Sequence, residues 1–297
     1  MMKTLAAIPA WNQEMRVASI VHLTKGHVDA VLVINDGSND RTAKLAEMAG
    51  AIVLNHDVNK GYGGALKSCF HYAKENGYDA MVILDSDGQH DPDQIPAVFR
   101  PVIDQSADIS IGSRFLDSDV DVPRYRKVGI GVITKLTNTA SGNGLAIKDS
   151  QSGFRAYSKR AIEAIEIFEN DMGASVEILL QANKHGLKIA EVPISINYDE
   201  DSSSQNPVGH GLRVVGSIVR YMEFEHPLLV FGVTGFIMVC VSSILGAWSY
   251  YNYDQSGFLP FGPTILALLF MISGMLMGIT GLILHAVISA NHRLWGR

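Results

Sequence analysis

The chain has 297 residues, of which 24 are basic and 30 acidic, giving a formal charge of -6. A hydrophobic content of 47% excludes an intrinsically disordered chain, and the mild acidity argues against nucleic acid as a partner. The two cysteines, Cys69 and Cys240, form neither a disulfide framework nor a metal-binding spacing, as expected in a reducing compartment.

The first 225 residues alternate short apolar runs with amphipathic stretches. We expect strands at residues 5–8, 30–34, 51–54, 80–84 and 108–111, and helices at residues 12–23, 41–49, 64–76 and 174–185. The apolar runs do not alternate with polar residues, which indicates a mostly parallel sheet covered by helices on both faces. Ligands of such sheets bind at the carboxyl ends of the strands, so the residues after each run are the first candidates for a site.

Two long apolar segments follow, residues 227–251 and 263–290, each long enough to cross a hydrocarbon core about 30 Å thick. From His226 onward the only Asp, Glu, Lys and Arg residues are Asp254, Arg293 and Arg297, which argues against a wholly soluble protein. Small residues along both segments permit close packing, either within one hairpin or between protomers of a homo-oligomer.

Basic residues flank the two apolar segments on their outer sides, and residues 252–262 between them contain no Lys or Arg. The positive-inside rule therefore places both ends in the cytoplasm and the connecting loop outside. Residues 211–226 have apolar positions at helical spacing, which is typical of an amphipathic helix at the inner membrane surface. A linker helix packed on the soluble domain fits this pattern equally well.

Two aspartates, Asp85 and Asp87, follow the expected strand at residues 80–84. Two carboxylates at the end of a buried strand are costly unless positive charge lies beside them. Mg²⁺ or Mn²⁺ suits such oxygen ligands, and Mg²⁺ is usually held by one or two carboxylates together with substrate phosphates. An acidic loop that only caps the next helix is the alternative. An EF-hand is excluded, because Pro96 stands where its bidentate Glu should be.

Other polar groups follow the remaining strands. Asp36 could accept hydrogen bonds from a nucleobase or ribose, and Trp11 offers an aromatic face. The glycine-rich residues 59–64 could hold an anion, although a plain helix start explains them better. Basic residues occur at Arg114 and within residues 124–127. They could bind phosphate, or could form a solvated helix face. Glu177 is a lone helical glutamate, a type that usually lies at the surface or caps a helix.

Seven motifs in order make the chain similar to the family 2 glycosyltransferases of the GT-A fold. Within that family it resembles the dolichyl- or polyprenyl-phosphate sugar synthases, and most of all their archaeal members. The motifs are IPAWNQE, VINDGSNDRT, NKGYGGAL, LDSDGQHDPDQIP, IGSRF, DSQSGFRAYSK and EVPISINYDEDSSSQNPVGHGL, which together cover about residues 3–215.

The resemblance implies a Rossmann-like α/β catalytic domain with a mostly parallel sheet, followed by an interfacial helix and a two-helix transmembrane hairpin. The expected boundaries are residues 1–210 for the cytoplasmic catalytic domain, 211–226 for the amphipathic helix, 227–251 and 263–290 for the transmembrane helices, 252–262 for the external loop and 291–297 for the cytoplasmic tail.

The resemblance also implies roles for matching residues. Those that would bind the nucleotide-sugar are Pro9, Trp11, Gln13, Glu14, Ile34, Asp36, Asp85, Ser86 and Asp87. The metal would be held by Asp85, Asp87 and Gln89, and the acceptor phosphate by Arg114, Arg126 and Lys127. A loop containing Tyr198, Gln205, Asn206 and His210 would close over the donor. The catalytic set is expected to comprise Asp85, Asp87, Gln89, Arg114 and, on a helix that carries a carboxylate in other branches, Glu177.

The chain departs from the family pattern at three places. Asn12-Gln13 replaces the usual Asn-Glu, Asn35-Asp36 replaces Asp-Asp, and residues 198–210 lack the Arg and Lys of the mannosyltransferases. A UDP-sugar is therefore favoured as donor, with GDP-mannose as the second choice.

The implied activity is inverting, metal-dependent transfer of one sugar to dolichyl or polyprenyl phosphate, by a multi-pass protein of the cell membrane. Two alternatives remain. A processive polysaccharide synthase would carry a Gln-x-x-Arg-Trp motif, and this sequence has none. A non-catalytic membrane scaffold would bind nucleotide without turning it over.

Overall fold

The computed structural model describes residues 2–116, 134, 147–171, 173–196 and 227–295, without the side chains of residues 229 and 288–295. The chain divides into two compact units, Met1–Ile218 and Val219–Arg297. Several expectations lie outside the described residues: the amphipathic helix at 211–226, the basic residues Arg126 and Lys127, and the loop residues Tyr198, Gln205, Asn206 and His210.

A seven-stranded sheet forms the centre of the first unit, in the order β3-β2-β1-β4-β6-β5-β7. The strands are β1 Thr4–Ala10, β2 Ala30–Asn35, β3 Ile52–Asn55, β4 Ala80–Ile83, β5 Ile109–Ser113, β6 Arg155–Ser158 and β7 Ile189–Pro193. Only β6 runs antiparallel to its neighbours β4 and β5 among these strands, so the expected mostly parallel sheet is confirmed. β6 and β7 were not anticipated from the sequence.

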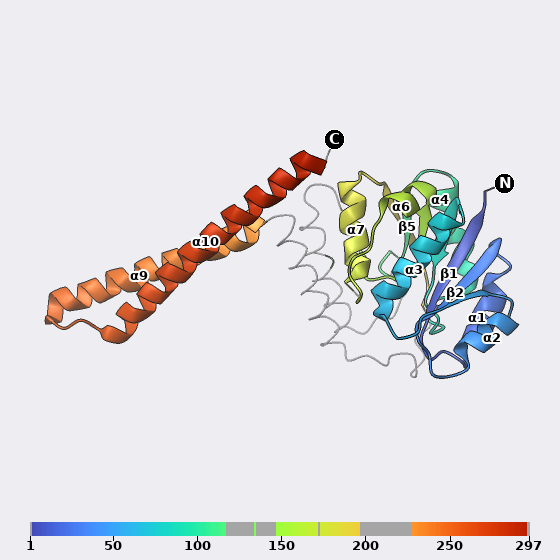
Figure 1. Cartoon of the computed structure of the whole chain (residues 1–297), viewed down its shortest axis with the longest axis horizontal. Helices are drawn as coiled ribbons and strands as arrows, with labels where there is room; N and C mark the ends of the chain where they lie inside the picture. Colours follow the sequence, from blue (N-terminus) through green and yellow to red (C-terminus); the bar gives the residue numbers. More distant parts are fainter. Residues whose placement is uncertain (1, 117–133, 135–146, 172, 197–226, 296–297) are drawn as a thin grey trace. The chain divides into compact units, whose positions relative to one another are not determined.

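Helices cover both faces of this sheet, as Figure 1 shows. Those around the sheet are α1 Val17–Thr24, α2 Thr42–Met48, α3 Gly61–Glu75, α4 Ile95–Ile103, α6 Lys159–Ala164 and α7 Ala174–Lys184, with the 3-10 turn η1 at Pro92–Gln94. Alternate strand residues face opposite layers: Leu32 and Ile34 pack with α3, α6 and α7, whereas Val31 and Val33 pack with α1, α2 and α4.

The arrangement of the strands brings the expected functional residues to one edge of the sheet. β1 lies between β2 and β4, and all three are parallel, so their carboxyl ends meet there. Asp36 follows β2, Asp85 comes shortly after β4, and Arg114 follows β5. The point at which strand order reverses in such a sheet is where α/β proteins bind ligands.

The second unit is a hairpin of two long helices, α9 Val233–Ser256 and α10 Phe261–Trp295, preceded by a π-helical turn, η2 Leu228–Gly232. α9 extends beyond the expected residue 251 to Ser256 and is followed by Gly257, whose φ of 69° is readily adopted by glycine. Two 27-residue spans, Val230–Ser256 and Phe261–Val287, are long and apolar enough to cross a membrane. Only 11% and 17% of their most apolar windows is buried, unlike a soluble core helix.

Small residues bring α9 and α10 together. A Cβ on Gly235 would lie 2.6 Å from the Gly274 carbonyl oxygen, and one on Gly274 would lie 2.8 Å from the Gly235 carbonyl oxygen. The Ser242 hydroxyl donates to the carbonyl of Ala267 at 2.7 Å, which adds a hydrogen bond between the helices. Part of the small-residue pattern in the sequence therefore serves packing within the hairpin.

Candidate active site

The loop after β4 presents the two aspartates that the sequence singled out. Asp85 keeps 32% of its side-chain surface exposed, and the Asp87 carboxylate accepts a hydrogen bond from the Gln89 backbone N–H at 2.9 Å. Loss of solvent raises the pKa of Asp85 to about 6, and burial together with the Asp85 charge raises the pKa of Asp87. Negative charge is thus held here at a cost that a bound cation would relieve.

Within the described residues no group of three or more His, Cys, Asp or Glu side chains is arranged to hold a metal ion. Two carboxylates, in a loop that also contains Gln89, nevertheless fit a hard divalent cation. Such an ion is commonly held by one or two carboxylates and completes its shell with water and substrate phosphates.

His90 supports this loop and was not singled out in the sequence. Its ring is buried against Phe154, with ring centroids 5.1 Å apart, and its Nδ1 accepts the Asp85 backbone N–H at 3.3 Å. Burial lowers the pKa of His90 to about 4, so the imidazole is neutral near pH 7. It therefore acts as a hydrogen-bonding support for the loop. Only its position in the loop, beside the two aspartates, could have drawn attention to it.

Arg114 is held by a buried carboxylate. Its Nε and Nη2 each donate to Asp149 at 2.7 Å, and Asp149 is fully buried. Glu191, on β7, accepts the backbone N–H groups of Lys148 and Asp149 at 2.9 Å and fixes the loop that carries this partner. The bidentate pair sets the direction of the guanidinium at the carboxyl edge of the sheet.

Arg155, at the start of β6, is a second buried cation beside the site. Its guanidinium donates to the backbone carbonyls of Ser150, Ser152 and Ser175 at 2.7 to 2.8 Å. Its charge opposes the rise in the pKa of Asp85. The loop it organises brings Gly153 against that carboxylate: a Cβ on Gly153 would lie 2.5 Å from Asp85 Oδ2. Only glycine leaves the carboxylate where it is.

At the end of β2, Asp36 is buried and its carboxylate makes three hydrogen-bond contacts. Its Oδ1 lies 2.6 Å from His56 Nδ1 and accepts the Lys60 backbone N–H at 2.9 Å, while its Oδ2 accepts the Gly61 N–H at 3.0 Å. His56 in turn contacts the Ser68 hydroxyl through Nε2 at 2.8 Å. The glycine-rich helix start is thus tied to Asp36 by its backbone. The histidine was missed because no local motif marks it.

Other residues expected at the nucleotide are Pro9, Trp11, Ser86 and Ile34. Trp11 is 52% exposed beside the strand edge, and Ser86 donates through its hydroxyl to the carbonyl of Pro9 at 2.7 Å, which joins β1 to the aspartate loop. Ile34 is fully buried in the core on the α3 side of the sheet, because alternation along β2 turns its side chain to that face. Binding of the nucleotide by Ile34 stays a prediction.

Gln13 and Glu14 connect the loop after β1 to the start of α2. The Gln13 backbone N–H donates to the Thr42 hydroxyl at 2.7 Å, and the Glu14 carboxylate accepts from Arg41 Nε at 3.1 Å. These contacts organise the two loops around Asp36. Binding of the nucleotide by either side chain stays a prediction.

Glu177, on α7, directs its carboxylate at a neighbouring loop. Both of its oxygens lie 3.1 Å from the Phe168 backbone nitrogen, and Oε2 accepts from the Glu169 N–H at 3.0 Å. That loop packs against α3, where the Gly63 N–H donates to the Asn170 carbonyl at 2.8 Å. Burial raises the pKa of Glu177. These contacts are those of a loop-positioning residue, and a catalytic role for it stays a prediction.

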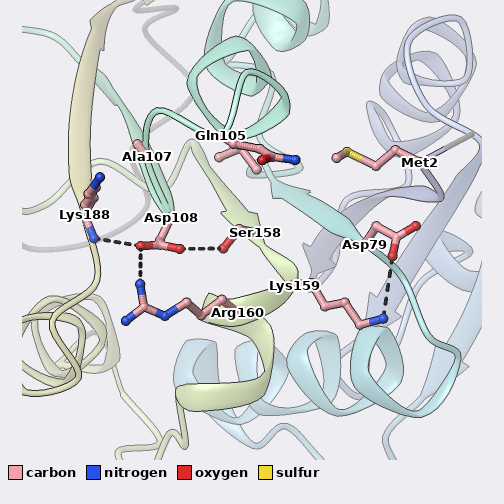
Figure 2. A pocket seen from close by; sticks show the side chains of 10 residues that line it. Met2, Asp79, Gln105, Ala107, Asp108, Ser158, Lys159, Arg160 and Lys188 are labelled. Carbon is pink, nitrogen blue, oxygen red and sulfur yellow. Dashed lines mark hydrogen bonds and ion pairs between the residues drawn. The ribbon is translucent and has the colours of Figure 1, made fainter.

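A separate pocket of about 520 Å³ lies at the opposite, amino-terminal ends of the parallel strands. Figure 2 shows two ion pairs at this pocket: Arg160 Nη1 lies 3.2 Å from the Asp108 carboxylate, and Lys159 Nζ lies 3.7 Å from that of Asp79. Asp108 also accepts the Lys188 backbone N–H at 2.9 Å. None of the residues that line this pocket belongs to the aspartate loop. The candidate active site lies at the other edge of the sheet, at the carboxyl ends of the parallel strands.

Residues 6–166 match the sequence model of glycosyl transferase family 2. The chain belongs to this family. The match extends from β1 through β6, so it includes the aspartate loop, Arg114 and the loop around Gly153. The protein is therefore a glycosyltransferase with a GT-A-type catalytic unit, as the sequence motifs indicated.

Two relatives and one solved structure are similar to this glycosyltransferase. It is 33% identical over 67% of its length to the UDP-N-acetylglucosamine–dolichyl-phosphate N-acetylglucosaminyltransferase of Methanococcus voltae, covering 87% of that protein. It is 31% identical over 74% of its length to the undecaprenyl-phosphate mannosyltransferase of Micrococcus luteus, covering 94% of that protein. The fold matches glucosyl-3-phosphoglycerate synthase from Mycobacterium tuberculosis, crystallised with Mn²⁺ and UDP-glucose, with a TM-score of 0.60 at 19% identity over 74% of this chain and 78% of that one.

Proposed function

We propose that this glycosyltransferase transfers a single sugar from a nucleotide-diphosphate sugar to dolichyl or polyprenyl phosphate. The observation that carries the proposal is that one chain combines the paired carboxylates Asp85 and Asp87 and the clamped Arg114 with two helices of membrane-spanning length. Relatives named for dolichyl-phosphate and undecaprenyl-phosphate substrates support the acceptor class.

Asp85, Asp87 and Gln89 would hold Mg²⁺ or Mn²⁺. When bound, the cation would neutralise charge on the leaving diphosphate. The Mn²⁺ and UDP-glucose in the crystallised structural neighbour support a divalent ion at this kind of site. Gly153 and His90 keep the Asp85 carboxylate and its backbone in place, so that the ligands are preorganised before the donor arrives.

The acceptor in the proposed reaction needs no strong general base, because a phosphate monoester is already an anion. One of its oxygens forms the bond to the anomeric carbon while the bond from that carbon to the diphosphate breaks. The bonding electrons leave with the nucleoside diphosphate, and a single displacement inverts the anomeric centre. Arg114, directed by Asp149, would hold the acceptor phosphate in line, with Arg126 and Lys127 predicted to assist.

The surroundings of Asp36 favour a UDP-sugar as donor. A carboxylate offers about four lone-pair sites, and His56 and the two backbone N–H groups occupy three of them. The lone-pair site that remains on Asp36 suits the single ring N–H of uracil better than the two adjacent donors of guanine. The lack of Arg and Lys in residues 198–210 points the same way, and GDP-mannose is the second choice.

The two apolar helices explain how the enzyme would meet a lipid acceptor. α9, with 24 residues at about 1.5 Å each, is long enough to cross a hydrocarbon core of roughly 30 Å. The distribution of Arg residues supports a cytoplasmic location for the catalytic unit at the cell membrane. A Cβ on Gly246 or Gly278 would meet no atom of the described residues within 4 Å, which leaves room for a second hairpin in a homo-oligomer.

A donor screen tests the proposal. The purified protein in detergent, with Mn²⁺ or Mg²⁺ and polyprenyl phosphate, is offered radiolabelled UDP-glucose, UDP-N-acetylglucosamine, UDP-galactose or GDP-mannose. We expect one donor to give label in the organic phase, and Asp87→Ala to abolish it. Nucleotide binding without transfer from any donor would instead support a non-catalytic scaffold or another acceptor.

A further inference from the structure

Arg16 lies beside the aspartate loop, although neither its sequence position nor any motif suggested a role. It immediately precedes α1, where its backbone carbonyl accepts the N–H of Ile20 at 3.1 Å. From there its half-buried side chain reaches the loop after β4, and Nη1 donates to the backbone carbonyl of Asp87. A Cβ on Gly88 would lie 3.4 Å from Arg16 Cδ, so the arginine packs directly over this glycine.

The charge of Arg16 is placed where the site is most negative. Asp85 and Asp87 lie in the same loop, and the positive charge of Arg16 favours the ionised form of Asp87. A guanidinium carries five N–H donors in a rigid plane. Among the described residues, the one hydrogen bond of this side chain is that from Nη1 to the Asp87 carbonyl. Most of its donors thus have no partner in the part of the chain that the structure describes.

The other two arginines of the site are used differently. Arg114 Nε and Nη2 donate hydrogen bonds to the Asp149 carboxylate. Arg155 is buried, and its guanidinium donates to three backbone carbonyls. Arg16 comes instead from the α1 side and meets the loop at the residue that carries the second metal-ligating carboxylate. A planar cation with spare donors at this position matches the oxygens of a diphosphate.

We propose that Arg16 binds the diphosphate of the donor while its bond to the Asp87 carbonyl holds the aspartate loop in place. The inference rests on the proposed function, because it assigns a further residue to the same donor site. Since charge accumulates on the diphosphate as the sugar leaves, a fixed cation there lowers the barrier as well as tightening binding.

Calorimetric titration of UDP and UMP into the full-length protein in detergent with Mn²⁺ tests this role. The titrations are repeated in EDTA, because a residue that only shapes the aspartate loop would affect UDP binding through the metal alone. A group that touches the diphosphate discriminates between the two nucleotides without the metal as well. We expect Arg16→Gln to weaken UDP binding about 10- to 100-fold, the range for a charge-assisted hydrogen bond, and to change UMP binding less than about threefold. Arg16→Lys should restore part of the loss, because it keeps the charge without the fork.

Arg100→Gln is the matched control, since Arg100 is exposed on α4 and pairs only with the exposed Asp104 among the described residues. It should bind UDP as the wild type does. Equal losses for UDP and UMP in Arg16→Gln, or no loss, would overturn the inference. If the wild type prefers GDP, the same comparison with GDP and GMP applies. Wild-type binding of the nucleotide without lipid glycosylation would count against the proposed function alone, and absence of any nucleotide binding would overturn both.

Discussion

Gly153 offers a direct perturbation of the site, because the three atoms nearest to the Cβ of an alanine there all belong to Asp85. The Cβ of an alanine would lie 2.5 Å from Asp85 Oδ2 and 3.0 Å from Asp85 Cγ, whereas ordinary contacts begin at 3.4 Å. The carboxylate must therefore move by about 0.9 Å, the difference between 2.5 and 3.4 Å. The atom that moves is the end of a side chain, so the fold can relieve the clash by turning Asp85.

A displacement of about 1 Å in a catalytic group costs up to about 10²-fold in rate, or roughly 2.7 kcal/mol in the barrier. We therefore expect Gly153→Ala to lower kcat/KM for the donor by one to two orders of magnitude, measured as label transferred to polyprenyl phosphate. Its Mn²⁺ affinity, measured by calorimetry, should fall as well. The melting temperature should change little.

Gly26→Ala serves as the control, because among the described residues a Cβ there meets only the Leu23 carbonyl oxygen, at 3.7 Å. The double variant Gly153→Ala/Asp85→Ala should lose no more activity than Asp85→Ala alone, since both changes act on one carboxylate. A Gly153→Ala enzyme with wild-type kcat/KM and wild-type Mn²⁺ affinity would refute the assignment of Asp85 to the metal.

Four further predictions address the rest of the site. Asp149→Asn leaves Arg114 without its buried counter-charge, and should cost about 3 kcal/mol in unfolding free energy and at least tenfold in activity. Unchanged stability in denaturant titration and unchanged turnover would contradict the role of Asp149 in holding Arg114. Glu177→Gln should cost about 1.5–3 kcal/mol in unfolding free energy with nearly unchanged kcat, whereas a large fall in kcat would restore a catalytic role. Because the pKa of Asp85 is raised to about 6, its carboxyl takes up a proton as the pH falls through that value. The affinity for Mn²⁺ should therefore decline from pH 7 to pH 5. A calorimetric Mn²⁺ affinity that does not change with pH would argue against Asp85 as a ligand. Removing residues 219–297 should reduce transfer to membrane-embedded acceptor far more than UDP binding; full turnover by the truncated chain on vesicles would show that the hairpin is dispensable.

The sequence predicted the parts of the fold that local pattern controls. The buried runs of β1, β2 and β4 are continuous and apolar, and Asp36 and Asp85 come after strands whose ends must meet in a parallel sheet. β6 escaped prediction because its four residues include a buried arginine, a residue type rarely found in a core.

The contacts that tune the site could not have been predicted from sequence spacing. His56 reaches Asp36, and Asp149 reaches Arg114, only through the tertiary fold. Ile34 is expected at the nucleotide by resemblance, and the direction of its side chain, into the core on one face of β2, is known only from the fold. Glu177 was expected on a helix, and α7 contains it, but its backbone partners lie in a loop that no periodicity marks.

The identity of the product tests the central claim most directly. Mass spectrometry and phosphorus NMR of the organic phase, after reaction with the donor found in the screen, would show what has been made. The account predicts a polyprenyl phosphodiester that carries a single sugar with an anomeric configuration opposite to that of the donor. A lipid diphosphate, a polymer, a retained configuration or only free sugar in the aqueous phase would contradict it.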